Sequence, residues 1–335
     1  MATFITVITS TEIARIFKIS SPQDFESLAL RLFQFQYRHN KVYHSFCNHL
    51  NIDSISVKKH GDIPFLPISF FKSHRVTTTD ENTPFIFESS GTTGSVTSKH
   101  FITDISLYEK SFLKGFEQFY GPVENTCILA LLPSYLERQN SSLVYMANRL
   151  IKMSKHQNSG FYLTDLSALK DTLQHLESKK TKSILIGVSF ALLDFATQFP
   201  MKLSHCILME TGGMKGRRKE MIREELHSIL KNAFGLAKIH SEYGMTELLS
   251  QAYSKGDGLF KAPPWMKVCI RDTEDPLSWQ APGKTGGINI IDLTNAYSCP
   301  FIATQDLGKM HSDGKFEVLG RFDHADVRGC NLMAL

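Results

Sequence analysis

The chain has 335 residues, which is enough for one large domain or two modest ones with a sizeable core. Its 42% hydrophobic and 21% charged residues are typical of a globular protein, and its net charge of +4 is too small to indicate a nucleic-acid partner. No stretch approaches the roughly 18 apolar residues of a membrane span, and the six cysteines form no C-x-x-C pair, which argues against a zinc site and a disulfide scaffold.

The N-terminal part of the chain is predicted to be helical and then irregular. Residues 1–5 contain no basic segment, so we expect no signal peptide and a cytoplasmic location, which the scattered cysteines also favour. Residues 24–50 place apolar side chains at helical spacing, with a plausible helix start at Asp24 after Pro22. Residues 57–88 are broken by three prolines and are predicted to be irregular, with short strands.

From residue 104 onward, short apolar runs alternate with helical patterns. The predicted helices span about 104–119 and 141–153, then a segment up to 198 and a charged one at 217–233, while the apolar runs lie at 128–132, 184–188 and 206–209. This alternation predicts βαβ units and a mainly parallel sheet, the α/β class. After residue 285 the pattern becomes β-rich. The sequence therefore predicts an α/β core over residues 1–285 and a smaller β-rich subdomain over residues 286–335.

A segment rich in serine, threonine and glycine spans residues 88–99. Two glycines three positions apart allow a tight turn, and successive N–H groups together with hydroxyls form a concave donor surface for phosphate oxygens. No Gly-Lys-Ser/Thr follows, so this is not a Walker A loop. The alternative is a flexible linker, but apolar residues at 85–87 and 101–102 flank the segment closely, which favours a phosphate site. The residues of this predicted site are Ser89, Ser90, Gly91, Thr92, Thr93 and Gly94.

This loop resembles the phosphate loop of the adenylate-forming superfamily, which includes acyl-CoA synthetases, luciferases and peptide-synthetase adenylation domains. Three further motifs that resemble this superfamily follow in its order, and the four together span residues 89–329. The resemblance implies the large N-terminal α/β domain of the acyl-CoA synthetase-like fold with a small β-rich C-terminal subdomain. It also implies ATP as substrate, Mg²⁺ as cofactor and no mobile C-terminal domain in this chain.

The second motif, Ser-Glu-Tyr-Gly-Met-Thr-Glu, resembles the superfamily's Tyr-Gly-x-Thr-Glu. The ring of Tyr243 could stack on adenine, and Gly244 lets the backbone turn close to the nucleotide. Thr246 could donate a hydrogen bond to the α-phosphate, and Glu247 offers a hard oxygen ligand for Mg²⁺. The alternative is an ordinary helix start that is capped by Thr246 or Ser241.

The remaining motifs imply contacts to the sugar and the base. Thr-Gln-Asp-Leu-Gly is similar to the superfamily's Thr-Gly-Asp, which implies that Asp306 accepts hydrogen bonds from both ribose hydroxyls. A later Gly-Arg segment resembles the hinge motif and implies that Arg321 reaches the ribose or a phosphate. Gly212 and Gly213 follow a predicted strand and precede a predicted helix, a place that lines the adenine pocket in this superfamily and that favours anions.

One short branch of the superfamily, the LuxE-type acyl-protein synthetases, is especially similar. The similarity rests on residues 132–138, 140–146, 210–217 and 328–332. In that branch a cysteine near the C-terminus accepts the acyl group, and Cys330 matches it by position, beside Arg328, whose charge would favour the thiolate. Most members of the superfamily carry a lysine in a further C-terminal domain. No residue here corresponds to it, although Lys99 and Lys215 are weak candidates.

The resemblance predicts an ATP-dependent ligase that converts a carboxylic acid, in particular a fatty acid, to acyl-AMP and passes the acyl group to Cys330. Its catalytic residues would be Cys330, Thr246 and Glu247, with Glu247 also the metal ligand. The expected partners are the acid and an acyl-acceptor protein, reductase or carrier protein. One alternative is an acyl-CoA or acyl-carrier ligase of the phenylacetate-CoA ligase type. Another is a nucleotide-binding subunit without catalytic activity, because the C-terminal lysine has no counterpart.

Overall fold

A computed structural model of the chain describes residues 8–80, 83–90, 96–133, 140–212 and 221–322. Its contacts divide the chain into two compact units. We call residues 82–263 the central unit, and we call the combination of residues 1–81 and 264–335 the terminal unit. The boundary predicted at residue 285 is a different division of the chain, and it remains a prediction.

The central unit is built around a largely parallel sheet. Its strands run in the order β10-β9-β8-β7-β6-β4-β5, parallel from β8 to β5 and antiparallel among β8, β9 and β10. The bounds are β4 Cys127–Leu131, β5 Gly160–Phe161, β6 Ser183–Gly187, β7 Cys206–Glu210, β8 His240–Tyr243, β9 Ala252–Ser254 and β10 Phe260–Lys261. Strands β4 and β6 are buried along their whole length, which explains their continuous apolar sequences.

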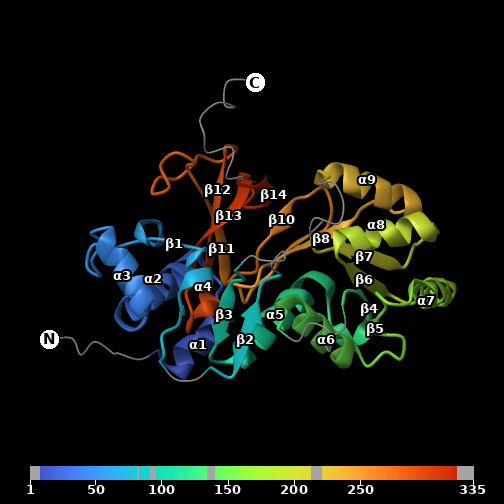
Figure 1. The fold of residues 1–335 in the computed structure, drawn as a ribbon, viewed down its shortest axis with the longest axis horizontal. Helices are drawn as coiled ribbons and strands as arrows, with labels where there is room; N and C mark the ends of the chain where they lie inside the picture. Colours follow the sequence, from blue (N-terminus) through green and yellow to red (C-terminus); the bar gives the residue numbers. More distant parts are fainter. Residues whose placement is uncertain (1–7, 81–82, 91–95, 134–139, 213–220, 323–335) are drawn as a thin grey trace. The chain divides into compact units, whose positions relative to one another are not determined.

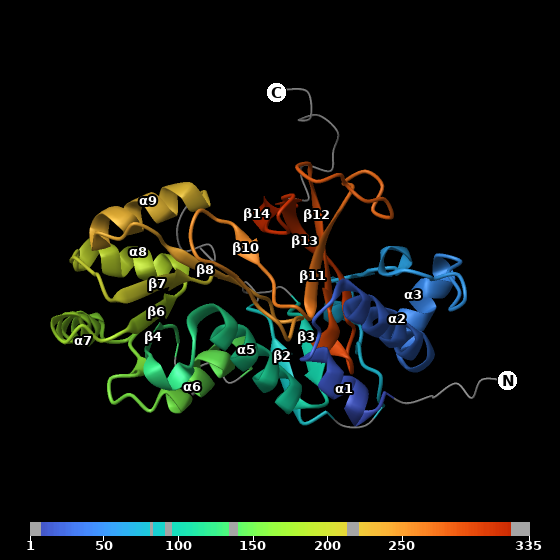
Figure 2. The same cartoon turned by 180° about the vertical axis from the view of Figure 1, so that it is seen from behind.

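Helices cover both faces of this sheet. Figures 1 and 2 show α8 and α9 over one face and α5 and α6 over the other. The helices are α5 Ile105–Tyr120, α6 Ser142–Ser154, α7 Leu166–Ser178, α8 Ser189–Gln198 and α9 Arg223–Phe234, with a short 3-10 helix, η2, at Val123–Asn125. Asp104 and Ser141 cap α5 and α6, so those predicted starts are confirmed to within a residue. Helix α9 begins at Arg223, later than the predicted residue 217.

A separate two-stranded hairpin carries the predicted phosphate loop of the central unit. Strand β2, Phe85–Glu88, pairs antiparallel with β3, Lys99–Ile102. The two apolar segments that flank the loop in the sequence are therefore strands, as expected. Glu88 N–H also donates to the carbonyl of Asn140 (2.8 Å), which ties the hairpin to the segment before α6.

The terminal unit combines N-terminal helices with C-terminal strands. Its strands β11, β12, β13 and β14 form an antiparallel series, and β1 pairs parallel with β13. The strands are β1 Leu66–Pro67, β11 Met266–Arg271, β12 Thr285–Asp292, β13 Phe301–Met310 and β14 Phe316–Arg321. The helices are α1 Ser10–Ile16, α2 Pro22–His39, α3 Lys41–His49 and α4 Phe70–Ser73, with 3-10 helices η1 His60–Asp62 and η3 Leu293–Asn295.

Asn40 divides the single helical stretch predicted over residues 24–50 into α2 and α3. Its backbone is extended, and its side-chain oxygen accepts from the N–H of Tyr43 (3.1 Å), so it caps α3. Its amide nitrogen donates to the carbonyl of Ser298 (2.9 Å), and Gln36 donates to the carbonyl of Ala296 (2.7 Å). These buried contacts fix the N-terminal helices to the segment between β12 and β13.

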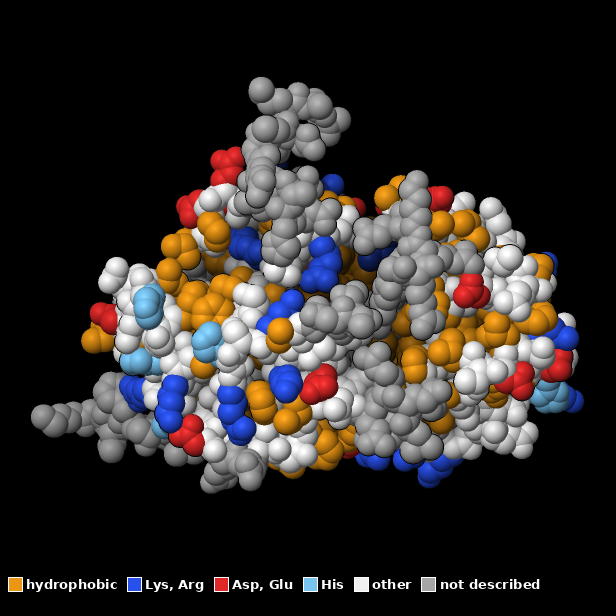
Figure 3. All heavy atoms as spheres, viewed as in Figure 1, with side chains coloured by type: hydrophobic (Ala, Val, Ile, Leu, Met, Phe, Trp, Pro, Cys, Tyr) orange, Lys and Arg blue, Asp and Glu red, His pale blue; other side chains and the backbone are white. Residues whose placement is uncertain are grey.

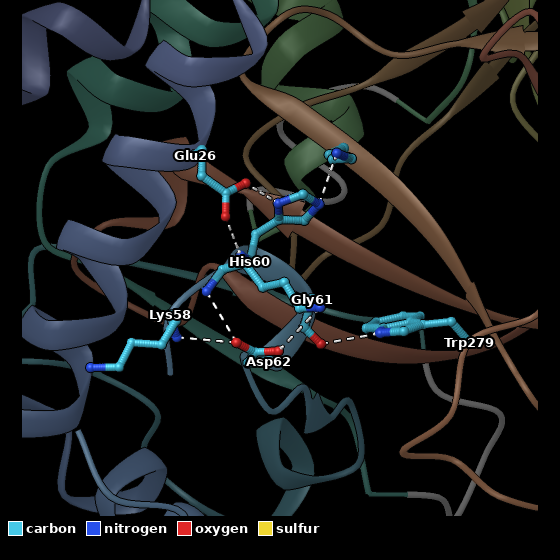
Figure 4. A network of polar contacts seen from close by, with 8 residues as sticks. Glu26, Lys58, His60, Gly61, Asp62 and Trp279 are labelled. Atoms are coloured by element: carbon cyan, nitrogen blue, oxygen red, sulfur yellow. Dashed lines mark hydrogen bonds and ion pairs between the residues drawn. The ribbon is translucent and has the colours of Figure 1, made fainter. Parts of the chain in front are cut away.

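A polar network also joins α2, η1 and β11 (Figure 4). The N–H of His60 donates to Glu26 (2.6 Å), and its Nδ1 contacts the other oxygen of Glu26. The ammonium of Lys267 lies 2.8 Å from His60 Nε2. Because an ammonium can only donate, Nε2 accepts and Nδ1 carries the proton that it shares with Glu26. The indole of Trp279 donates to the carbonyl of Gly61 (3.1 Å), which ties its loop to η1.

The face drawn in Figure 3 is mixed in character. On this face, Lys and Arg side chains lie mostly singly or in pairs between apolar and uncharged polar ones. Among the described residues, no helix is both long and apolar enough to span a bilayer.

Candidate active site

The base of the predicted phosphate loop is fixed by two hydrogen bonds. Ser89 N–H donates to the carbonyl of Ser98 (3.0 Å), and Ser98 N–H donates to the hydroxyl of Ser89 (2.9 Å). The two ends of the loop are thus held together directly after β2 and before β3. Ser90 is exposed beside them. Gly91, Thr92, Thr93 and Gly94 lie outside the described residues.

His100 on β3 connects this hairpin to the second predicted motif. Its Nδ1 lies 2.8 Å from the carbonyl oxygen of Thr246, and its side chain is completely buried. Burial lowers the pKa of His100 to about 4, although the bond to Thr246 opposes that effect. The imidazole is therefore neutral at pH 7. Since a carbonyl only accepts, Nδ1 is the donor.

The second motif begins on a strand. Ser241 and Tyr243 belong to β8, so a helix start capped by Ser241 is not what forms here. Thr246 lies in the turn that follows, where Leu248 N–H donates to the carbonyl of Met245 (3.1 Å). The ring of Tyr243 is 8% exposed and meets Phe260 edge-on at 5.9 Å, so its role in stacking on adenine remains a prediction.

Glu247 is the predicted ligand for Mg²⁺. It is 5% exposed and follows Thr246 directly in the same turn. Among the described residues no group of three or more His, Cys, Asp or Glu side chains could hold a metal ion. A single buried carboxylate is compatible with Mg²⁺, which keeps several waters and commonly binds one or two carboxylates together with substrate phosphates.

Glu210, at the end of β7, shapes the turn that contains Gly212. Its carboxylate accepts from the N–H of Gly212 (2.6 Å) and from Arg223 on α9 (3.3 Å), and His227 lies 3.6 Å away. Gly212 has a φ of 72°, a conformation that favours glycine. Burial would raise the pKa of Glu210, but His227 and Arg223 outweigh it and hold that pKa below its ordinary value. Gly213 lies outside the described residues.

The third and fourth predicted motifs meet across β13 and β14 in the terminal unit. Asp306 pairs with Arg321, and their side chains lie 3.7 Å apart. Arg321 also donates to the amide oxygen of Gln305 (3.2 Å), the residue that replaces the glycine of the resembled motif. Asp306 N–H donates to the hydroxyl of Thr304 (3.1 Å). Two residues predicted from separate motifs are therefore neighbours.

Arg271 braces the strand that presents Asp306. Its guanidinium donates to the carbonyl of Ile288 (2.8 Å), the side chain of Asn289 (2.7 Å) and the carbonyl of Thr304 (2.7 Å). It also lies over the ring of Phe322 at 5.4 Å. One side chain thus links β11, β12, β13 and the end of β14.

Cys330, the predicted acyl acceptor, lies outside the described residues. The five described cysteines are free thiols. Burial raises the pKa of each: to about 12 for Cys47 and Cys206, to about 11 for Cys127 and Cys269, and still higher for Cys299. These five are protonated at pH 7. Four of them are buried, in agreement with the expectation that they belong to the core, whereas Cys269 is half-buried.

Comparisons with known proteins decide the family. A family model described as "Acyl-protein synthetase, LuxE" matches residues 14–334. The chain belongs to the LuxE acyl-protein synthetase family. No curated protein sequence matches this LuxE-family chain at a significant level.

Solved structures of adenylate-forming ligases share the fold of this LuxE-family chain. A 2-hydroxyisobutyryl-CoA ligase in complex with R3-HIB-AMP aligns with a TM-score of 0.66 at 10% identity, over 92% of this chain and 70% of that one. ATP-bound MatB from Rhodopseudomonas palustris aligns with a TM-score of 0.52 at 19% identity, over 70% of this chain and 47% of the MatB chain. The LuxE-family chain spans about half the length of the MatB structures that it matches. The predicted fold class, an α/β adenylate-forming domain, is confirmed.

Two parts of this LuxE-family site were not predicted from the sequence. His100 stands two positions after Ser98 on a strand, and nothing in the sequence indicates its bond to Thr246. The carboxylate of Glu210 was included in a motif, but its partners Arg223 and His227 were not predicted. Arg223 and His227 lie four residues apart, so they share one face of a helix, and this spacing could have indicated that both contact the same partner.

Proposed function

We propose that this chain binds ATP and Mg²⁺, activates a carboxylic acid, in particular a fatty acid, as acyl-AMP, and transfers the acyl group to a thiol, its own Cys330. The observation that carries the proposal is the bond between His100 and Thr246. It joins the strand after the predicted phosphate loop to the predicted Thr-Glu turn, and this supports a common role of the two segments at the phosphates. Membership of the LuxE family supports the same chemistry.

The first step is attack by the carboxylate on ATP. One carboxylate oxygen bonds to the α-phosphorus, the bond between that phosphorus and the bridging oxygen to the β-phosphate breaks, and pyrophosphate leaves. A carboxylic acid is ionised at pH 7, so no general base is required. Loop N–H groups and the Thr246 hydroxyl would stabilise the negative charge that spreads over the phosphate oxygens.

The other predicted residues would hold the nucleotide. Glu247 would hold Mg²⁺, which supplies positive charge to the phosphates when it is bound. Asp306 would accept hydrogen bonds from the ribose hydroxyls. Arg321, 3.7 Å from Asp306 and 70% exposed, has the freedom to reach a ribose or phosphate oxygen.

The second step transfers the acyl group. The Cys330 thiol loses its proton to solvent, the thiolate bonds to the acyl carbonyl carbon, and AMP leaves with the electron pair of the broken bond. The five described cysteines hold their protons at pH 7, which supports Cys330 as the acceptor. A further acceptor protein, reductase or carrier protein would then take the acyl group.

Pyrophosphate exchange into ATP across a panel of carboxylic acids tests the first step. We expect exchange that depends on an added acid and that falls at least 10-fold in Thr246→Val. Binding of ATP without exchange for any acid would favour a nucleotide-binding subunit instead. Exchange followed by acyl transfer only to added coenzyme A or carrier protein would favour a ligase of the phenylacetate-CoA ligase type.

A further inference from the structure

Two buried polar side chains of the central unit contain an atom without a hydrogen-bond partner among the described residues, and a buried carboxyl lies beside them. Tyr253 and Gln251 are 2% and 6% exposed, and neither the Tyr253 hydroxyl nor the Gln251 amide oxygen has a hydrogen-bond partner among the described residues. Glu242 is 7% exposed, and no hydrogen bond to a described residue influences its pKa. Leaving a polar group buried without a partner costs about 1–3 kcal/mol. Two such groups beside a buried carboxyl call for a ligand that pairs with them.

These side chains converge on one face of β8 and β9. Glu242 stands directly opposite Tyr253 in the antiparallel pairing, so their side chains are neighbours. Side chains alternate along a strand, which places Gly244 and Gln251 on the same face one step further along. A Cβ added at Gly244 would collide with Oε1 of Glu242 and would lie 3.3 Å from Cγ of Gln251. The Glu242 carboxyl therefore occupies the space above Gly244, beside Gln251.

Aromatic residues of α5 pack against Tyr253. The ring of Tyr253 lies 5.1 Å from Phe119 and 5.4 Å from Tyr120. The hydroxyl of Tyr120 has a partner of its own, His240 (3.3 Å). The Tyr253 hydroxyl and the Gln251 amide oxygen are buried without a partner in the described part of the chain. A ligand group that forms hydrogen bonds to these two atoms is therefore strongly preferred over one that does not.

The chemistry of the cluster suits an uncharged ligand group. Burial, with a smaller contribution from Glu210, raises the pKa of Glu242 to about 8, so the carboxyl is mainly protonated at pH 7. It then both donates and accepts, as does the hydroxyl of Tyr253, while the amide oxygen of Gln251 accepts. A hydroxyl, which also donates and accepts, matches this set without introducing a charge.

The cluster lies close to where the acyl group would be formed. Thr246 and Glu247, the residues assigned to the α-phosphate and its metal, follow Gly244 within three positions, a separation of at most about 10 Å. The acyl carbonyl is bonded to that phosphate in acyl-AMP. A substituent a few bonds from the carbonyl would therefore come within reach of Glu242.

We propose that Glu242, Gln251 and Tyr253 bind a hydroxyl group on the acyl chain, so that the preferred substrate is a hydroxylated carboxylic acid and not its plain alkyl counterpart. This inference rests on the proposed adenylation. It deepens that function by naming the substrate class.

Pyrophosphate exchange with matched acids tests this inference. The full chain is given straight-chain carboxylic acids of 6 to about 14 carbons, each without and with a single hydroxyl at successive positions, and also the amino-substituted acids. We expect at least one hydroxy acid to exceed its plain counterpart about 10-fold in kcat/KM. Tyr253→Phe and Glu242→Met should each reduce that preference at least 5-fold. Glu242→Gln, which keeps a donor and an acceptor, should restore most of it, and Tyr120→Phe is the matched control and should leave it unchanged.

The outcomes separate the two proposals. Equal or better exchange with plain acids, or an unchanged preference in Tyr253→Phe, would overturn the hydroxyl site and leave adenylation standing. A preference for the amino-substituted acids over the hydroxy acids would overturn the assignment of an uncharged ligand group to this site. Exchange with no acid at all would overturn both. Thermal unfolding of Tyr253→Phe reports on folding, and because the hydroxyl has no partner we expect its melting temperature to be unchanged or raised.

Discussion

The imidazole of His100 donates a hydrogen bond of 2.8 Å to the main-chain carbonyl of Thr246. The two residues lie far apart in the sequence and on different elements, β3 and the turn after β8. The bond holds the backbone of the Thr-Glu turn, and the side chains of Thr246 and Glu247 keep their positions with it. A neutral histidine that cannot be protonated until about pH 4 makes this link insensitive to pH in the physiological range.

Removing that link should weaken nucleotide binding. His100→Ala leaves the Thr246 carbonyl without its buried donor, so we expect the Kd for ATP in titration calorimetry to rise about 10-fold, equivalent to about 1.4 kcal/mol. His44→Ala is the control, because His44 bonds to the carbonyl of Tyr37 on an exposed part of the terminal unit. Unchanged ATP affinity in a folded His100→Ala variant would contradict the role given to His100.

Glu242 should make the folded state less stable as pH rises. Its pKa is about 8 in the folded state against an ordinary value of 4.5. Between these values the unfolded chain loses the proton and the folded chain keeps it, so stability falls with rising pH by up to on the order of 1 kcal/mol per pH unit. Glu242→Gln removes this dependence on pH. In urea unfolding, the free energy of unfolding of Glu242→Gln relative to the wild type should therefore increase from pH 5 to pH 8. A difference that is constant over this range would count against a protonated Glu242.

The Glu26 carboxylate should stabilise the terminal unit above pH 5. Burial would raise its pKa, but the bonds from His60 and the charge of Lys267 outweigh this and lower it. A lowered pKa gives stability that is present above the ordinary value of 4.5 and is lost as pH falls through the lower folded value. We expect Glu26→Gln to cost about 1 kcal/mol at pH 7 and much less near pH 3.

Two comparisons make the Glu26 measurement decisive. Lys41→Met breaks a pair with Asp80 in which both side chains are at least 80% exposed, so its cost in urea unfolding should be within about 0.5 kcal/mol of zero. If Glu26→Gln costs no more than this control at pH 7, the network in Figure 4 contributes little to stability.

Self-acylation should depend on Cys330. Incubation with ATP and an accepted acid should add one acyl mass to the intact protein, and Cys330→Ser should abolish it, because a serine hydroxyl has no comparable anionic fraction at pH 7. Cys269→Ser should keep the label, since burial holds the Cys269 thiol protonated. Label on Cys330→Ser would move the acceptor elsewhere. Hydroxylamine should release the label if it is a thioester.

The α/β alternation was predictable because β4, β6 and β7 of the central sheet are locally distinct. The apolar runs at β4, β6 and β7 do not alternate between apolar and polar residues, but the helical patterns on either side identify them as buried parallel strands. The division at Asn40 was missed, because both α2 and α3 have the same helical period and only the cap interrupts them. Strand β11 was also missed, since its alternation of buried and half-buried residues is short.

The site was only partly predictable, for a physical reason. Motif residues such as Asp306 and Arg321 could be named singly, but their pairing depends on the register of β13 and β14. His100, Arg271 and the group formed by Glu242, Gln251 and Tyr253 act through contacts between distant segments. No local pattern encodes such contacts, so their chemistry emerges only from the folded structure.

The pairing of α2 with the far end of the chain has a consequence for biosynthesis. Gln36 bonds to a residue 260 positions later, and β1 pairs with β13, so the N-terminal helices leave the ribosome long before their partners exist. The central unit is continuous and can fold during translation, whereas Tyr43 on α3, whose ring lies 5.8 Å from Phe301 on β13, lacks that partner in the meantime. Completion of the terminal unit is thereby coupled to synthesis of the last strands, and a chain that stops before β13 would present an aggregation-prone helix surface.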